Sequence, residues 1–318
     1  MEPKSLGGLL CFALISLESF IGIVTNSFII FMILFSYFKY HKVSSTDKII
    51  VGLSISNTFF ACIAYVDIMI YYFWPVVFVT SNIVPAVFTC IMFNLTTSSW
   101  LTASLSFFYF VKIKNYSLSF FSWLRNNINS LVPWMILTSV GLAFLSAFLN
   151  IIQFTLMDRD SQNLMTIHVG NTSWSFHSTG VFPENLYISF ISCIVPFMIS
   201  VMATGSATWS LNLHRLKMLR KNTVLSSNGN MQKYSYTIRI MIRLVIFYGF
   251  FYTIMFLFYF NIYPLASAGF WAFLVIMCSY SPTQSILLCL ATIKLRKACR
   301  KIFHCSAESI EESESRED

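Results

Sequence analysis

Two acidic side chains, Glu18 and Asp67, lie inside long apolar segments and are the first candidates for chemistry. An ionisable group in apolar surroundings costs free energy, so each carboxyl group needs a functional or structural reason. Glu18 precedes Gly22 by one helical turn and Asn26 by two, which favours a structural role between neighbouring helices. Asp67 is placed either to pair with a cationic ligand in an open pocket, or to reach interfacial water or a neighbouring helix.

A polar run inside another apolar segment, FNLTTSSW, is the second candidate. Asn94 and Ser98 in this run are four residues apart, so they share one face of a helix. Two interpretations stay open. The side chains line a ligand cavity, or they join adjacent helices through hydrogen bonds.

Basic residues gather where the apolar segments end. The stretch WLTASLSFFYFVKIKNYS carries no charge before Lys112 and Lys114. The same edge is expected to include His214, Lys217, Arg239, Arg243 and Lys294. These side chains are expected to reach lipid phosphates, as long basic side chains do at a membrane surface, or to dock an acidic protein partner.

The motifs of most enzyme and metal-binding classes are missing. The eight cysteines show no CxxC or metal-like spacing, and there is no HExxH and no Walker-type glycine-rich loop. We therefore predict no enzyme activity, no metal site, no cofactor and no nucleic-acid partner. The cysteines are interpreted as small buried hydrophobic residues.

The composition identifies the surroundings of these residues. The chain of 318 residues is 56% hydrophobic and 11% charged, whereas soluble domains carry about 25% charged residues. Its mean hydropathy is +0.68. A membrane-spanning helix needs about 20 apolar residues. Seven segments are long enough, near residues 8–38, 49–73, 83–111, 131–153, 184–211, 241–261 and 268–292.

Positive charge predicts the orientation, because cytoplasmic loops carry an excess of lysine and arginine. Of the 21 lysines and arginines, all but Lys4 and Arg159 fall on one side of a seven-span arrangement. The expected fold is an all-α membrane protein, a seven-transmembrane helix bundle with an extracellular N-terminus and a cytoplasmic C-terminus. Residues 1–299 would form one receptor domain in the plasma membrane.

Three Asn-x-Ser/Thr triplets occur, at Asn94, Asn115 and Asn171. Only Asn171 lies in a long predicted outer loop, 154–183, so it is the predicted glycosylation site. Within the spans, Pro196 and Pro282 are predicted to interrupt the fifth and seventh helices. We expect structural roles for both prolines and for Asn26 and Asn57.

After the last span, the string KLRKACRKIFHC predicts a basic amphipathic helix on the inner leaflet. Cys299 and Cys305 are candidates for palmitoylation there. Residues 300–318 form an acidic cytoplasmic tail, which we expect to be disordered.

Several of these strings resemble the bitter taste (type 2 taste) receptors, a family of G-protein-coupled receptors. The third-segment string matches that family at Trp100, Leu105, Ser106, Phe108, Tyr109, Phe110, Lys112, Ile113, Asn115 and Ser117. Phe108-Tyr109-Phe110 stands where most receptors of the larger class have Asp-Arg-Tyr. ESFIGIVTNSFI resembles the family's first helix, SLNLHRLKM the end of its fifth, and QSILLCLATIKLRKA the end of its seventh.

The chain also departs from the family pattern. Asn57 stands where the family has arginine, Gln284 where it has histidine, and Thr292 where it has asparagine. Ile91 and Leu95 fall where the family often has a pocket tryptophan and asparagine. These differences imply a divergent member with its own ligand range.

The resemblance implies a receptor that binds bitter small molecules from outside and engages a gustducin-like heterotrimeric G protein, leading to phospholipase C and calcium release. The expected ligand contacts are Asp67, Asn94, Ser98, Phe251 and Leu274. The expected G-protein edge comprises Tyr109, Lys112, His214, Lys217 and Lys294.

Membrane lipids are further expected partners, and a homo-oligomer stays open. Two alternative functions stay open as well. A vomeronasal type 1 pheromone receptor shares the architecture, and a ligand-gated channel or transporter subunit is the alternative from another class of protein.

Overall fold

The computed structural model describes residues 6–41, 43–74, 83–113, 119–165, 183–220, 228–259, 268–292, 295–296 and 298–299. In these residues the regular secondary structure is entirely α-helical. The helices are α1 (Leu6–Tyr40), α2 (Ser45–Phe73), α4 (Ile83–Ile113), α5 (Ser119–Met165), α6 (Pro183–Arg220), α7 (Asn228–Tyr259), α8 (Ala268–Cys278) and α9 (Tyr280–Ala291).

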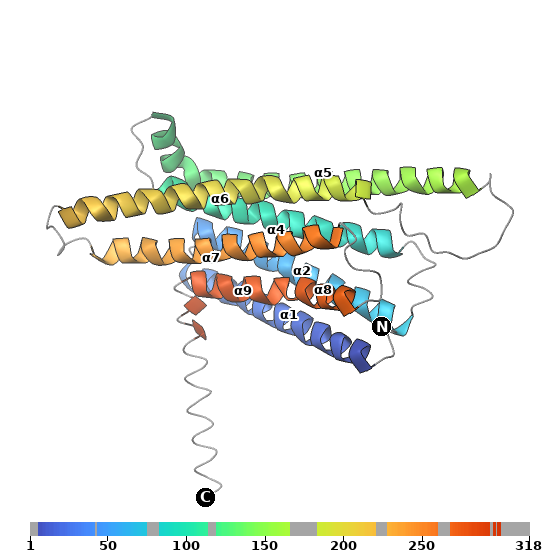
Figure 1. Ribbon diagram of the computed structural model, residues 1–318. Helices are drawn as coiled ribbons and strands as arrows, with labels where there is room; N and C mark the ends of the chain where they lie inside the picture. Colours follow the sequence, from blue (N-terminus) through green and yellow to red (C-terminus); the bar gives the residue numbers. More distant parts are fainter. Residues whose placement is uncertain are drawn as a thin grey trace, which may run out of the picture.

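The helices form a bundle of rods that run side by side (Figure 1). Helix α4 packs against α2, α5 and α6, while α1 packs against α2, α8 and α9. The start of α1 and the end of α9 lie at opposite ends of the bundle (Figure 1). We call these the N-terminal and C-terminal ends of the bundle. This placement corresponds to an odd number of passes, with α8 and α9 together making the last one.

Six helical segments of the described chain are long and apolar enough to cross a membrane. They are α1, α2, α5, α6, α7 and the α8–α9 pair. Helix α4 is not among the six, and it carries the polar run at 94–99 in its middle. Those polar side chains are buried, so they face neighbouring helices instead of lipid.

Two regions of the bundle exceed the predicted spans. The 47 residues of α5 have a length along the helix of about 70 Å, whereas the hydrocarbon core of a bilayer is about 30 Å thick. The predicted span 131–153 is therefore only its central part. Helix α5 extends beyond its neighbours at the N-terminal end, and α6 and α7 extend together at the C-terminal end (Figure 1).

The two prolines expected to interrupt helices behave differently. The interruption expected at Pro196 does not occur, because α6 continues through it as one helix. Proline is tolerated within membrane helices when neighbouring groups satisfy the freed backbone. The last pass does break, at Ser279, between α8 and α9. Pro282 has no N–H to donate to the carbonyl group of Cys278, which explains a weak point in the helix here.

The core of the bundle is one large apolar cluster that runs along α2, α4, α5, α7 and α9. A second, smaller cluster joins α1, α2 and α8 through Ile15, Ala64, Ile68, Trp271 and Cys278. Large apolar side chains on the outer surfaces of α1, α5 and α6 are exposed, for example Phe31, Phe144 and Met202. This pattern is expected of a protein whose solvent is lipid.

Candidate functional site

Four helices meet at a buried asparagine cluster formed by Asn26, Asn57, Ser98 and Ser281. Asn57 Nδ2 donates to Asn26 Oδ1 at 3.3 Å, and Asn26 Nδ2 donates to Ser281 Oγ at 3.2 Å. Ser98 Oγ donates to Asn57 Oδ1 at 3.1 Å, and Ser281 Oγ donates to the Asn57 carbonyl oxygen at 3.0 Å. The cluster thereby ties α1, α2, α4 and α9 together at mid-depth, where buried polar groups need partners.

The predicted ligand residues Asn94 and Ser98 both face α2. Ser56 Oγ donates to the Asn94 carbonyl oxygen at 3.0 Å and lies 3.5 Å from Asn94 Oδ1. Asn94 Nδ2 donates to the carbonyl oxygen of Cys90 in its own helix at 2.8 Å. Of the two interpretations left open by the sequence, this geometry favours hydrogen bonds between adjacent helices.

A second polar group, the tyrosine junction, comprises Thr102, Tyr248, Tyr280 and Gln284. Gln284 Nε2 donates to the Tyr248 hydroxyl at 2.6 Å, and the Tyr280 hydroxyl donates to it at 3.2 Å. The Thr102 and Tyr248 hydroxyls lie 2.7 Å apart. The junction therefore links α7 to α4 and to α9.

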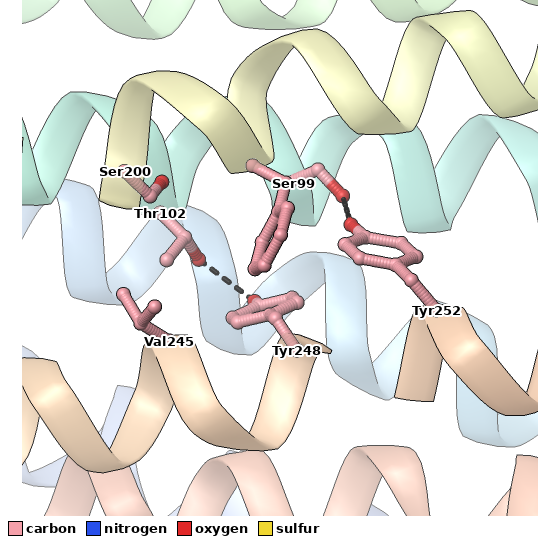
Figure 2. Close-up of a pocket in the computed structure, with 7 residues that line it drawn as sticks. Ser99, Thr102, Ser200, Val245, Tyr248 and Tyr252 are labelled. Carbon is pink, nitrogen blue, oxygen red and sulfur yellow. Dashed lines mark hydrogen bonds between the residues drawn. The ribbon is translucent and has the colours of Figure 1, made fainter. Parts of the chain in front are cut away.

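A small pocket of about 10 Å³ lies beside this junction, between α4, α6 and α7. Its lining residues are Ser99, Thr102, Phe197, Ser200, Val245, Tyr248 and Tyr252. Figure 2 shows the hydroxyls of Ser99 and Tyr252, and those of Thr102 and Tyr248, in direct hydrogen-bonded pairs. A cavity needs roughly 10–15 Å³ to hold one water molecule, so this pocket is about the size of a single water and has no room for a drug-sized ligand.

Sequence reasoning missed the residues that line this pocket. Ser99 belongs to the polar run that was noted, but Tyr248 and Tyr252 were not singled out. A usable signal was present, because the two tyrosines are four residues apart in an apolar helix and share one face. Two hydroxyls on one buried face require polar partners on a neighbouring helix.

The two acidic residues both lie in the N-terminal half of the bundle, near Cys278. Glu18 follows Ile15 by three residues and Asp67 follows Ala64 by three, so both belong to faces that form the second cluster. Both carboxyl groups are near enough to the Cys278 thiol to act on it electrostatically. Within the described part of the chain, neither has an ion pair, and Glu18 Oε2 is buried without a hydrogen-bond partner.

The remaining predicted ligand residues occupy different environments. Phe251 is fully buried in the large cluster, with its ring centroid 4.7 Å from that of Tyr280. Leu274 is half-buried and contacts both the large and the small clusters. Leu274 thus lies beside the second cluster, as Asp67 does, whereas Phe251 is part of the packed interior of the large cluster.

At the C-terminal end of the bundle, the Phe108-Tyr109-Phe110 string lies against the start of α2. The Tyr109 hydroxyl lies close to the Thr46 side chain and to Asp47. Lys112 Nζ lies 4.5 Å from the centre of the Phe108 ring, a cation–π geometry. The Tyr109 contacts hold α4 against α2 at this end, whereas the Lys112–Phe108 contact lies within α4.

Several predicted residues are beyond what the structure describes. Lys294, Asn171 and Cys305 lie outside the described residues, as do the side chains of His214 and Lys217. Cys299 is described and is a half-buried free thiol.

Comparison with known proteins gives a consistent result over nearly the whole chain. The taste receptor protein family (TAS2R) matches residues 3–307. Taste receptor type 2 member 8 of Pongo pygmaeus is 28% identical over 298 residues, covering 92% of this chain and 94% of that protein. Taste receptor type 2 member 39 of Homo sapiens is 26% identical over 307 residues, covering 92% and 86%.

Proposed function

The chain belongs to the taste receptor protein family (TAS2R), and from this premise we propose how it recognises ligands and signals. It is a bitter taste receptor and a multi-pass membrane protein, not an enzyme. The observation that carries this conclusion is the family match over residues 3–307, which spans every described helix. The match favours this function over the vomeronasal and channel alternatives.

The proposed topology has seven spans, with the N-terminal end of the bundle outside the cell and the C-terminal end in the cytoplasm. The distribution of lysine and arginine supports this orientation. Lys39 in the last turn of α1 and Lys112 in the last turn of α4 both belong to the proposed cytoplasmic end. In this topology Asn171 lies outside and carries a glycan, and the tail 300–318 lies in the cytosol.

The proposed ligand site lies in the extracellular half, where α1, α2 and α8 place Glu18 and Asp67 near Cys278. Asp67 would pair with the charged nitrogen of a cationic agonist, and Leu274 would contact its apolar part. The rings of Tyr71 and Trp271, with centroids 5.6 Å apart, provide aromatic surface nearby. Asn94, Ser98 and Phe251 would act indirectly, because their buried contacts fix the helices that form the site.

The proposed signalling partner is a gustducin-like heterotrimeric G protein at the cytoplasmic end, followed by phospholipase C and calcium release. Tyr109, Lys112, His214, Lys217 and Lys294 would form this edge. An acidic surface on the G protein would suit the basic side chains, which also suit anionic lipid headgroups. A ligand activates such a receptor only by binding the active arrangement more tightly than the resting one.

The test is expression of the full chain in cells with a gustducin-chimeric G protein, followed by calcium recording against a broad panel of bitter compounds. A dose-dependent response that disappears without the G protein is the expected result. Silence across the panel, with surface expression established by labelling, would contradict the proposed ligand class and coupling.

A further inference from the structure

The C-terminal end of the bundle is closed by apolar side chains from three helices. Ile240 and Leu244 of α7 are buried in the same cluster as Val111 of α4 and Leu288 of α9. If the proposed G protein inserts a segment at this end, α7 must therefore separate from α4 or α9. Polar contacts that join α7 to these two helices must break in the process.

Tyr248 makes such contacts, one helical turn from Leu244. Its hydroxyl accepts hydrogen bonds from Gln284 at 2.6 Å and from Tyr280 at 3.2 Å. A phenolic hydroxyl has one hydrogen to donate, and Thr102 Oγ1 at 2.7 Å is placed to accept it. Figure 2 shows Tyr248 directed at Thr102 across the gap between α7 and α4. The hydroxyl is thus saturated by partners from α4 and α9.

The hydrogen bond between Gln284 and the Tyr248 hydroxyl is costly in free energy to break. Its side chain is 0% exposed, and its bond to Tyr248 is the one hydrogen bond found for it in the described part of the chain. Its Oε1 atom is buried without a partner among the described residues. If α7 moved away, the whole amide group would be left buried and unpaired, which is more costly than losing an exposed contact.

We propose that the Tyr248 hydroxyl is a latch that holds the C-terminal end of the bundle closed. Agonist binding then signals by favouring an arrangement in which α7 has left Thr102 and Gln284. This inference rests on the proposed function and concerns its regulation. Receptors of this kind interconvert between arrangements that differ little in free energy, so loss of the latch shifts their populations about tenfold.

The first test is the agonist-independent signal of Tyr248→Phe, which keeps the ring and removes the hydroxyl. We expect a rise of about five- to tenfold at equal surface expression. Gln284→Leu removes the contact from the α9 side and should also raise the signal. Thr253→Val is the matched control, because the exposed Thr253 hydroxyl bonds only to the Gly249 carbonyl oxygen of its own helix, at 2.8 Å.

A second measurement separates failure of the latch from failure of the receptor function. Hydrogen–deuterium exchange in purified receptor should be about tenfold faster at residues 238–248 in Tyr248→Phe than in the unaltered chain or in Thr253→Val. This result does not depend on a G protein or a tastant. Unchanged exchange would refute the latch, whether or not a bitter response is found. An unchanged basal signal in both latch variants, in a receptor that answers a bitter compound, would refute it equally.

Discussion

Replacement of Gly22 by alanine tests a close contact between α1 and α9. A Cβ atom built on Gly22 in α1 lies 2.8 Å from Ser281 Oγ and 3.3 Å from Pro282 Cδ, both near the start of α9. The Ser281 side chain cannot rotate away without losing hydrogen bonds, because its hydroxyl donates to the Asn57 carbonyl oxygen and accepts from Asn26 Nδ2. The methyl group therefore forces α1 and α9 apart or breaks part of the asparagine cluster.

The expected loss in the free energy of unfolding follows from these two effects. Overpacking a tight contact costs about 1–3 kcal/mol. Each hydrogen bond lost by Ser281 costs about 1 kcal/mol. Alanine in a helix regains at most about 1 kcal/mol over glycine. When the overpacking is accompanied by the loss of one hydrogen bond, and the gain for alanine is subtracted, the net destabilisation is about 1–3 kcal/mol, which corresponds to a fall of roughly 2–10 °C in the unfolding temperature.

The assay is the temperature at which half of the detergent-solubilised, fluorescently tagged receptor loses its monodisperse elution peak. Gly141→Ala in α5 is the matched control, because nothing lies within 4 Å of its built Cβ atom. The double variant Gly22→Ala/Ser281→Ala should lose less than the sum of the two single variants, because the opposing oxygen is gone. Equal unfolding temperatures for Gly22→Ala and Gly141→Ala would refute the reasoning.

Three further substitutions test other contacts. Asn57→Leu removes the donor to Asn26 Oδ1 and the nearer of two acceptors of the Ser98 hydroxyl, and should cost about 1–2 kcal/mol, read as a lower unfolding temperature. Phe251→Ala empties a buried site against the Tyr280 ring and should cost about 3–5 kcal/mol, read as lost surface expression. Asp67→Asn should weaken cationic agonists about tenfold in calcium recordings and leave neutral agonists unchanged; equal shifts for both classes would contradict the proposed ion pair.

The amino-acid sequence by itself predicts the class of protein and the positions of its helices. Low charge and long apolar segments require a lipid solvent, and in lipid an isolated chain segment satisfies its backbone hydrogen bonds by forming a helix. Helices accordingly lie over each predicted apolar segment described here. The strings around Tyr109, His214 and Asn26 carried the family resemblance, which the comparison over residues 3–307 confirms.

The sequence did not decide which helix each polar face would meet. Helical spacing predicts that Asn94 and Ser98 share a face, and packing directs that face at Ser56 and Asn57 of α2. Likewise, Tyr248 is one of several aromatic residues in its segment. Only the approach of α4 and α9 turns its hydroxyl into a junction of three helices, because such contacts depend on residues far apart in the chain, which no local pattern records.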